Sequence, residues 1–335
     1  MDNSKRSLGI TLCIAATVSW GGMFPIMTHA LRHIDPFTFT CMRYTIAGAM
    51  FLLLLVRLEG TAALRLAGER VWLAWAFGTA GFAGFQFLVF YGQKLIGVGG
   101  ELVTSIMMAT MPMLGFFVNW FLKKVAPPKW AALFILMSLT GVLLVVSKGD
   151  VFSLLHQPKI YGPAALILFA ALCWVIYTAG AGFFPTWSPY RYTALTTLMG
   201  LGSAMVITLG LLVGHAVAVP TGGDVVSILP ELAYMGVVAG FGGVLCWNIG
   251  NKILTPLNGV LFMDVVPITA FTITALTGAV PVAAQLVGAG LTATALLCNN
   301  IYLRHRLATP VAAPEPAAVT AAAEPASSGA PAVSR

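Results

Sequence analysis

Charged residues are scarce in this chain, and their scarcity excludes a soluble globular protein. Asp, Glu, Lys and Arg make up 9% of the 335 residues, whereas 59% are hydrophobic and the mean hydropathy is +0.90. So little polar surface cannot cover a water-soluble domain of this size, and most of the chain must therefore be solvated by lipid. We expect an integral membrane protein.

Basic runs, clustered cysteines and nucleotide-binding loops are also missing. The net charge is +7, but the basic residues occur in ones to threes at the ends of apolar runs, so we expect no nucleic-acid partner. The cysteines lie singly in apolar segments without CxxC spacing, so we expect no metal and no cofactor. The glycine-rich stretch GVGGEL lacks the spacing of a phosphate-binding loop, which disfavours an ATP-driven pump.

The chain has long apolar runs instead. A hydrocarbon core about 30 Å thick needs roughly 20 apolar residues per helical span. Ten segments fit, and they predict an all-α membrane protein with ten transmembrane helices: Leu8–Ala30, Pro36–Arg57, Val71–Tyr91, Gly97–Leu122, Lys129–Ser147, Gly162–Phe183, Tyr190–Gly214, Pro230–Leu254, Asn258–Thr277 and Pro281–Leu303.

The distribution of basic residues predicts the topology. With the N-terminus inside, the cytoplasmic segments carry twelve Lys and Arg residues and the external loops carry four, which is the positive-inside pattern. Both termini are therefore expected in the cytoplasm. The first apolar run is longer than the apolar core of a signal peptide, so we interpret it as a retained helix. Residues 308–335 are rich in Ala and Pro and are expected to form a disordered cytoplasmic tail.

Two stretches of the chain repeat each other. GFAGFQFLVFYGQKL begins at Gly81 and GFGGVLCWNIGNKIL begins at Gly240, 159 positions later, while Pro112 and Pro267 follow at a nearly equal offset. These markers indicate a duplication of residues 1–150 in residues 151–307. Because five helices separate the copies, the second copy enters the membrane from the opposite side. The pattern predicts an inverted repeat, typical of alternating-access transporters with a site near the midplane.

A family resemblance accompanies this pattern. The stretches SWGGMFPIMTHALRHIDPFTFTCMRY, YGQKLIGVGGELVTSIMMATMPMLGFF, WNIGNKIL and LFMDVVPITAFTITAL resemble two EamA domains of the drug/metabolite transporter superfamily. The resemblance covers nearly all of residues 8–304. It implies ten helices in two five-helix halves and the export of a small organic solute or drug.

The two repeated prolines are candidate hinges. Pro112 and Pro267 lie inside apolar spans, where proline removes an amide donor and displaces the carbonyl four residues earlier. Those carbonyls belong to Met108 and Met263, whose thioethers suit an adaptable binding cavity. A packing kink without a ligand is the alternative interpretation.

Asp264 is the acidic residue placed deepest in an expected span. It lies three residues before Pro267 and roughly 9 Å from the cytoplasmic end of its helix, from the 1.5 Å rise per residue. A carboxylate at that depth is costly unless it has a partner or a function. We predict that it binds a cationic group or takes up a coupling proton; the alternatives are a hydrogen bond that pairs two helices and a residue that snorkels to the membrane interface.

Aromatic and amide side chains complete the candidate site. In the resembled family the first, third, sixth and eighth helices surround a central cavity, and here they carry aromatic residues. Trp20 and Trp174 lie too deep for the interfacial belt and suit stacking on a solute. Arg43 matches an arginine of the family pattern and is expected to anchor structure or lipid headgroups. The remaining predicted substrate-binding residues are Gln86, Tyr91, Tyr177, Trp247 and Asn248.

The sequence thus predicts a secondary transporter, and not an enzyme, in a bacterial cytoplasmic membrane. Its expected partners are the bilayer, a small-molecule substrate such as an amino-acid-like metabolite or a drug, and protons as a candidate coupling ion. We expect it to function as a monomer. The alternatives are a membrane-embedded lipid-processing enzyme, for which no nucleophile and base are evident, and a non-transporting scaffold or receptor.

Overall fold

The chain folds into a bundle of membrane-length helices. The computed structural model describes residues 3–124, 129–150, 159, 161–254, 259–276 and 282–308, and within these ranges every regular element is helical. This confirms the expected fold class as an all-α membrane protein. The predicted tail, residues 308–335, lies outside the described residues except for Ala308, which ends the last helix.

The first half of the chain supplies helices at each expected position. These are α1 (Asn3–Ala30), α2 (Pro36–Glu59), the continuous run α3 (Val71–Gly78), η2 (Thr79–Gly84) and α4 (Phe85–Ile96), the run α5 (Gly100–Met107), η3 (Met108–Thr110) and α6 (Met111–Lys123), and α7 (Lys129–Val146). A short turn, η1 (Thr61–Leu64), follows α2.

The second half follows the same order. It contains α9 (Tyr161–Gly180) with η5 (Ala181–Phe183), α10 (Pro189–Val213), the short surface helix α11 (Gly222–Ser227), the run α12 (Leu229–Ala233), η6 (Tyr234–Gly243) and α13 (Val244–Leu254), the pair η7 (Leu261–Asp264) and α15 (Val265–Leu276), and α16 (Ala283–Ala308).

Seven helical stretches of the described chain are long and apolar enough to cross a membrane. They are residues 4–30, 36–59, 71–96, 100–122, 161–183, 189–213 and 229–254. The other three expected spans fall on α7, on η7 with α15, and on α16, each of which borders residues outside the described ranges. The structure therefore confirms a multi-pass helical protein, and the total of ten spans stays a prediction.

The second helix of each half starts with the same local chemistry. The Asp35 carboxylate accepts hydrogen bonds from the amides of Phe37 and Thr38, both at 2.8 Å, and Pro36 occupies the first helical turn. The Ser188 hydroxyl caps α10 by accepting from the Arg191 amide at 3.0 Å, again with a proline next in sequence. A capping side chain followed by proline is a strong helix start, because proline lacks an amide that would need a partner there.

The helices depart from α geometry where the sequence repeats itself. The π-helical segments η2 and η6 contain the two Gly-Phe-x-Gly stretches, and the 3-10 turns η3 and η7 lie just before Pro112 and Pro267. Each proline lacks the amide that would complete the α-helical ladder, and a tighter turn before it is one way to satisfy the freed carbonyls. The same irregularities thus occur in both copies of the repeated sequence.

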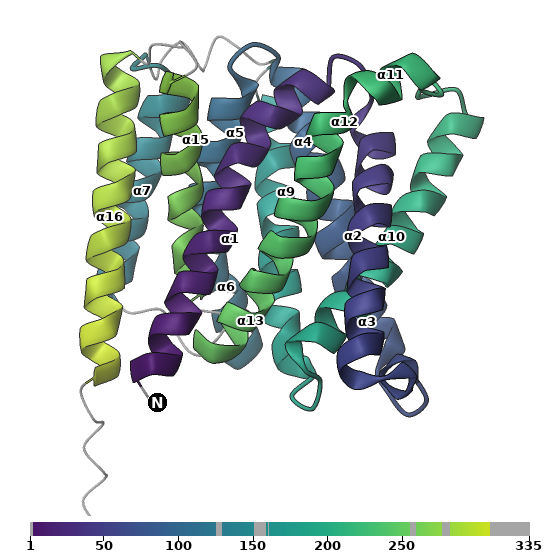
Figure 1. Cartoon of the computed structure of the whole chain (residues 1–335). Coiled ribbons are helices and arrows are strands. Elements are labelled where there is room, and N and C mark those ends of the chain that lie inside the picture. The colour runs from purple at the N-terminus through teal and green to yellow at the C-terminus, as the bar shows by residue number, and fades with distance from the viewer. Residues whose placement is uncertain are drawn as a thin grey trace, which may run out of the picture.

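Helices from the two halves pack against one another throughout the bundle. α1 packs against α13 and α15, α9 packs against α4 and α6, α2 packs against α10, and α7 packs against α16 (Figure 1). The N-terminus and the end of α16 lie at the same end of the bundle, the lower one in Figure 1. The centre of the bundle is therefore formed by residues that are distant in sequence.

Candidate functional site

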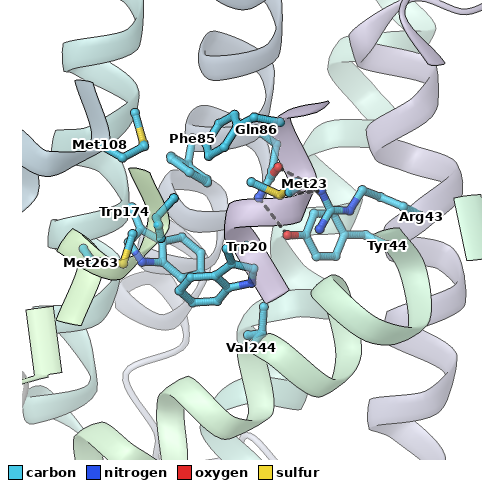
Figure 2. Close-up of a pocket in the computed structure, with 12 residues that line it drawn as sticks. Trp20, Met23, Arg43, Tyr44, Phe85, Gln86, Met108, Trp174, Val244 and Met263 are labelled. Carbon is cyan, nitrogen blue, oxygen red and sulfur yellow. Dashed lines mark hydrogen bonds between the residues drawn. The ribbon is translucent and has the colours of Figure 1, made fainter. Parts of the chain in front are cut away.

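A small cavity lies where α1, α2, α4 and α9 meet the turns η3 and η7 and the beginnings of α13 and α15. Its free volume is about 10 Å³, room for a single water molecule but not for a solute. Figure 2 shows its lining, which is aromatic and sulfur-containing at one end and polar at the other. The lining residues are Trp20, Met23, Phe24, Arg43, Tyr44, Phe85, Gln86, Met108, Trp174, Val244, Met263 and Val266.

Two tryptophans from the two halves meet at the apolar end. The ring centroids of Trp20 on α1 and Trp174 on α9 lie 5.1 Å apart in an edge-to-face arrangement. The Trp20 indole donates to the carbonyl of Ala239 in η6 at 3.0 Å, whereas the Trp174 indole nitrogen is buried without a hydrogen-bond partner. One ring is thus fixed by a hydrogen bond and the other is held by ring contacts.

The paired methionines also reach the cavity. Met108 comes from η3 and Met263 from η7, and both side chains are buried. Thioethers are flexible and polarizable, so they fill irregular space and can give way to a ligand. The two turns before the prolines therefore deliver equivalent side chains to one site, as the duplicated Met and Pro spacing predicted.

A polar network forms the other end of the cavity. The Arg43 Nη1 atom donates to Gln86 Oε1 at 3.2 Å and to the Met23 sulfur at 3.5 Å, and the Gln86 Nε2 atom donates to the Tyr44 hydroxyl at 2.8 Å. The guanidinium carbon lies 4.7 Å from the centroid of the Tyr44 ring, within cation–π range. Of the two expected roles of Arg43, anchoring lipid headgroups is wrong, because its side chain is 1% exposed and faces the interior, whereas its hydrogen bonds to Gln86 and Met23 agree with anchoring structure.

Three other predicted binding residues form a layer behind the cavity. The Trp247 ring lies 5.2 Å from that of Trp20, and the Tyr177 ring lies 5.1 Å from that of Trp174. The Asn248 amide nitrogen donates to the Tyr177 hydroxyl at 2.7 Å and to the Thr193 hydroxyl at 2.9 Å. These residues pack behind the side chains that line the cavity and are not part of the lining themselves.

Tyr91 lies outside this cluster. Its side chain is 39% exposed, and its ring packs at 5.7 Å against Phe37 on the outer surface of the bundle. Sequence reasoning also missed Met23 and Tyr44, which do line the cavity. Met23 follows Trp20 by three residues and so shares its helical face, a spacing that could have identified it.

Asp264 lies next to the cavity. The residue is 8% exposed, and its Oδ1 atom is buried without a hydrogen-bond partner. Its neighbours Met263 and Val266 line the cavity, whereas Asp264 itself does not. A buried carboxylate with an oxygen that lacks a partner is unfavourable in an apolar surrounding, which makes Asp264 a candidate for a function.

A second hollow opens on the side of the bundle near its lower end. It has a volume of about 850 Å³ and lies between α3, α6 and the end of α9 with η5. Its lining is almost wholly apolar, with Lys124 as the one charged residue among Leu73, Phe77, Phe117, Val118, Trp120, Phe121, Leu122, Ile176, Gly180 and Phe183. This hollow is large enough for a solute or an acyl chain.

The upper end of the bundle is closed by polar contacts to α1. The Gln93 amide nitrogen donates to the Phe24 carbonyl and to the Thr28 hydroxyl, both at 2.9 Å. The Thr28 hydroxyl donates to Glu101 at 3.4 Å, and His29 lies 2.7 Å from Glu231. These contacts tie α1 to α4, α5 and α12 at the upper end of the bundle.

A bundle of membrane-spanning helices around a mostly apolar cavity is typical of membrane transporters. Sequence comparison agrees. The family model described as "EamA-like transporter family" matches residues 7–147. An uncharacterized transporter of Bacillus subtilis (strain 168), YrdR, is 34% identical over 304 residues, which cover 91% of this chain and 94% of YrdR. The chain belongs to the EamA-like transporter family.

Two further proteins are similar over most of their length. Another uncharacterized transporter of Bacillus subtilis (strain 168), YyaM, is 25% identical over 295 residues, covering 88% of this chain and 93% of YyaM. A solved structure described as "Crystal structure of protein" superposes with a TM-score of 0.67 at 20% identity, covering 90% of this chain and 99% of that one. The structural match supports the fold alone.

Proposed function

We propose that this membrane transporter is a secondary exporter that moves a small metabolite or drug through the central cavity by alternating access. The observation that carries the proposal is the cavity itself, which is built from both halves of the chain, with polar contacts that tie α1 to α4 and α12 at the upper end of the bundle. Because it has room for one water molecule, solute binding requires its rings and thioethers to separate. The side hollow at the lower end gives the adjacent helices α3, α6 and α9 space in which to move.

The inverted repeat is part of this proposal. It is supported by the paired π-helical segments, the paired 3-10 turns before Pro112 and Pro267, and the matching helix contacts of α1 with α13 and of α9 with α4. Two similar halves can exchange conformations, so that a site between them opens to each side in turn. Under this proposal the lower end is cytoplasmic, the prolines are hinges, and the chain acts as a monomer in the bacterial cytoplasmic membrane.

Asp264 is the proposed coupling residue. It is buried beside the cavity, and one of its carboxylate oxygens has no partner. In the cycle it would bind a proton or a cationic substrate group and release it when the site reopens. Asp264→Asn removes the charge with little change of volume, so we expect insertion to be retained and flux to be abolished or to lose its pH dependence.

The test uses purified protein in proteoliposomes. Uptake and efflux of amino acids, other metabolites and cationic drugs are measured with and without a pH gradient. We expect flux of at least one solute class, lost or uncoupled in Asp264→Asn and retained in the exposed control Asp150→Asn. No flux of any solute, together with lipid hydrolysis, would favour the lipid-processing enzyme. Unchanged pH-dependent flux in Asp264→Asn would contradict the coupling role.

A further inference from the structure

The buried guanidinium of Arg43 lines the central cavity with most of its donors unused. Both hydrogen bonds that it makes in the described part of the chain come from Nη1, and its Nε atom is buried without an acceptor. An arginine side chain carries five N–H donors and stays protonated in proteins. A full positive charge with free donors therefore faces the site.

No carboxylate of the described chain lies within ion-pair distance of this charge, although Asp264 is buried beside the same cavity. The ion pairs found in the described residues join His29 to Glu231 and Arg191 to Glu69, and neither includes Arg43. The Arg43 contacts, with Gln86, the Met23 sulfur and the Tyr44 ring, are all neutral. A charge buried at membrane depth is expected to have an anionic partner, and no carboxylate of the described residues forms an ion pair with Arg43.

The surroundings of Arg43 hold it in position for a ligand. The Gln86 side chain bridges the Tyr44 hydroxyl and the guanidinium, so the arginine is fixed from two sides (Figure 2). Arginine binds carboxylates through two parallel N–H donors, and the fixed orientation lowers the entropic cost of forming them. The rest of the lining is aromatic or aliphatic and suits an apolar body attached to the anionic group.

We propose that Arg43 is the anion-binding residue of the transport site and selects solutes that carry a carboxylate next to an apolar or aromatic body. This inference rests on the proposed transport function and names the substrate class. A phosphate is a poorer match, because one guanidinium would face two negative charges in an otherwise apolar cavity. The carboxylate would occupy the donors that are unused in the empty site.

Binding is tested separately from flux, using the full chain in detergent. The probes are L-phenylalanine, L-leucine and phenylacetate, each compared with its amide, and inorganic phosphate. Binding is followed by the thermal denaturation midpoint and by tryptophan fluorescence, since Trp20 and Trp174 line the cavity. We expect at least one acid to bind at least about tenfold more tightly than its amide, because hydrogen bonds between charged groups are stronger than neutral ones.

Four variants assign that preference to Arg43. Arg43→Gln is expected to abolish the preference for the acid over its amide. Arg43→Lys is expected to retain part of this preference, since lysine keeps the positive charge but lacks the two parallel N–H donors of the guanidinium group. Arg57 is an exposed arginine on the same helix. Arg57→Gln removes the same charge and should leave the preference for the acid over its amide unchanged. Gln86→Glu places a carboxylate on the Arg43 donors, so it should abolish the preference in a well-folded protein even if Arg43→Gln does not fold.

The outcomes separate this inference from the transport function. Equal binding of acids and amides, no binding of any acid, tighter binding of phosphate, or a preference that survives in Gln86→Glu would each overturn the role of Arg43. Carboxylate-selective binding without flux would contradict the transport function and leave the site standing. Flux that does not distinguish an acid from its amide would contradict the role of Arg43 and leave the transport function standing.

Discussion

The hydrogen bond between Trp20 and Ala239 allows a quantitative test of how the two halves are held together. Trp20→Phe removes the indole donor that joins α1 to η6 at 3.0 Å and reduces the ring contacts at 5.1 Å to Trp174 and 5.2 Å to Trp247. Hydrogen bonds between membrane helices are worth about 0.6 kcal/mol on average and about 1.7 at most. Aromatic pairs add about 0.5–1.5 kcal/mol. We expect a loss of about 1–3 kcal/mol in the free energy of unfolding.

Trp174→Phe is the matched control for this loss. Trp174 is also buried and shares the ring contact with Trp20, and it packs at 5.1 Å against Phe85 and Tyr177 as well, but its indole nitrogen has no hydrogen-bond partner. Trp174→Phe keeps a ring in these contacts and removes a buried N–H group that has no acceptor, whereas Trp20→Phe loses a hydrogen bond. Trp174→Phe should therefore destabilise less than Trp20→Phe by about 0.6–1.7 kcal/mol. Trp75→Phe, at a position 52% exposed on α3, should change little. Reversible unfolding of the three variants by SDS in mixed micelles measures the differences. Equal losses for Trp20→Phe and Trp174→Phe would refute the reasoning.

Three further predictions concern packing, the surface helix and the hinges. Gly141→Ala should lower the thermal midpoint, because a Cβ atom there would lie 2.3 Å from the Thr292 hydroxyl and 2.5 Å from the Gly288 carbonyl. The control Gly210→Ala should leave the midpoint unchanged, since no atom lies within 4 Å of a Cβ atom at that position. Equal midpoints for the two variants would contradict the packing of α7 on α16. Hydrogen bonds from the Thr221 hydroxyl and amide hold the pKa of Asp224 below its ordinary value of 3.8, so the cap of α11 is intact above that pH and is lost as the pH falls through the lowered pKa. Hydrogen exchange of the α11 amides should accelerate as the pH falls through the lowered pKa of Asp224. Exchange that does not depend on pH, after correction for the intrinsic rate, would refute the role of Asp224 in this cap. The double variant Pro112→Ala with Pro267→Ala restores two helical amides and should reduce flux without lowering the thermal midpoint; full flux would exclude the hinge role.

Much of the fold follows from local sequence. The length of each apolar run predicts a span because a helix must satisfy its backbone groups across the hydrocarbon core. Asp35 and Ser188, each followed by proline, mark the starts of α2 and α10 by local chemistry alone. The repeated Met and Pro spacing predicted kinks at the prolines; the 3-10 turns before them, which carry Met108 and Met263 to one cavity, were found only in the structure.

The candidate site was only partly predictable. Trp20, Gln86, Met108, Trp174 and Met263 line the cavity as proposed from the sequence. Tyr91 faces outward, Asn248 and Tyr177 form the layer behind, and Arg43, assigned to an anchoring role, lies in the lining. The errors concern which way a side chain faces. They do not concern which helix carries it.

The sequence by itself therefore determines the membrane class, the helices and the duplicated pattern, because these depend on apolar length, caps and prolines along the chain. Tertiary structure alone decides which helix faces meet. In lipid the outer face of a helix is as apolar as its packed face, so hydrophobic periodicity does not reveal the inner side. The burial of Arg43 without a carboxylate partner became visible only when helices distant in sequence were brought together.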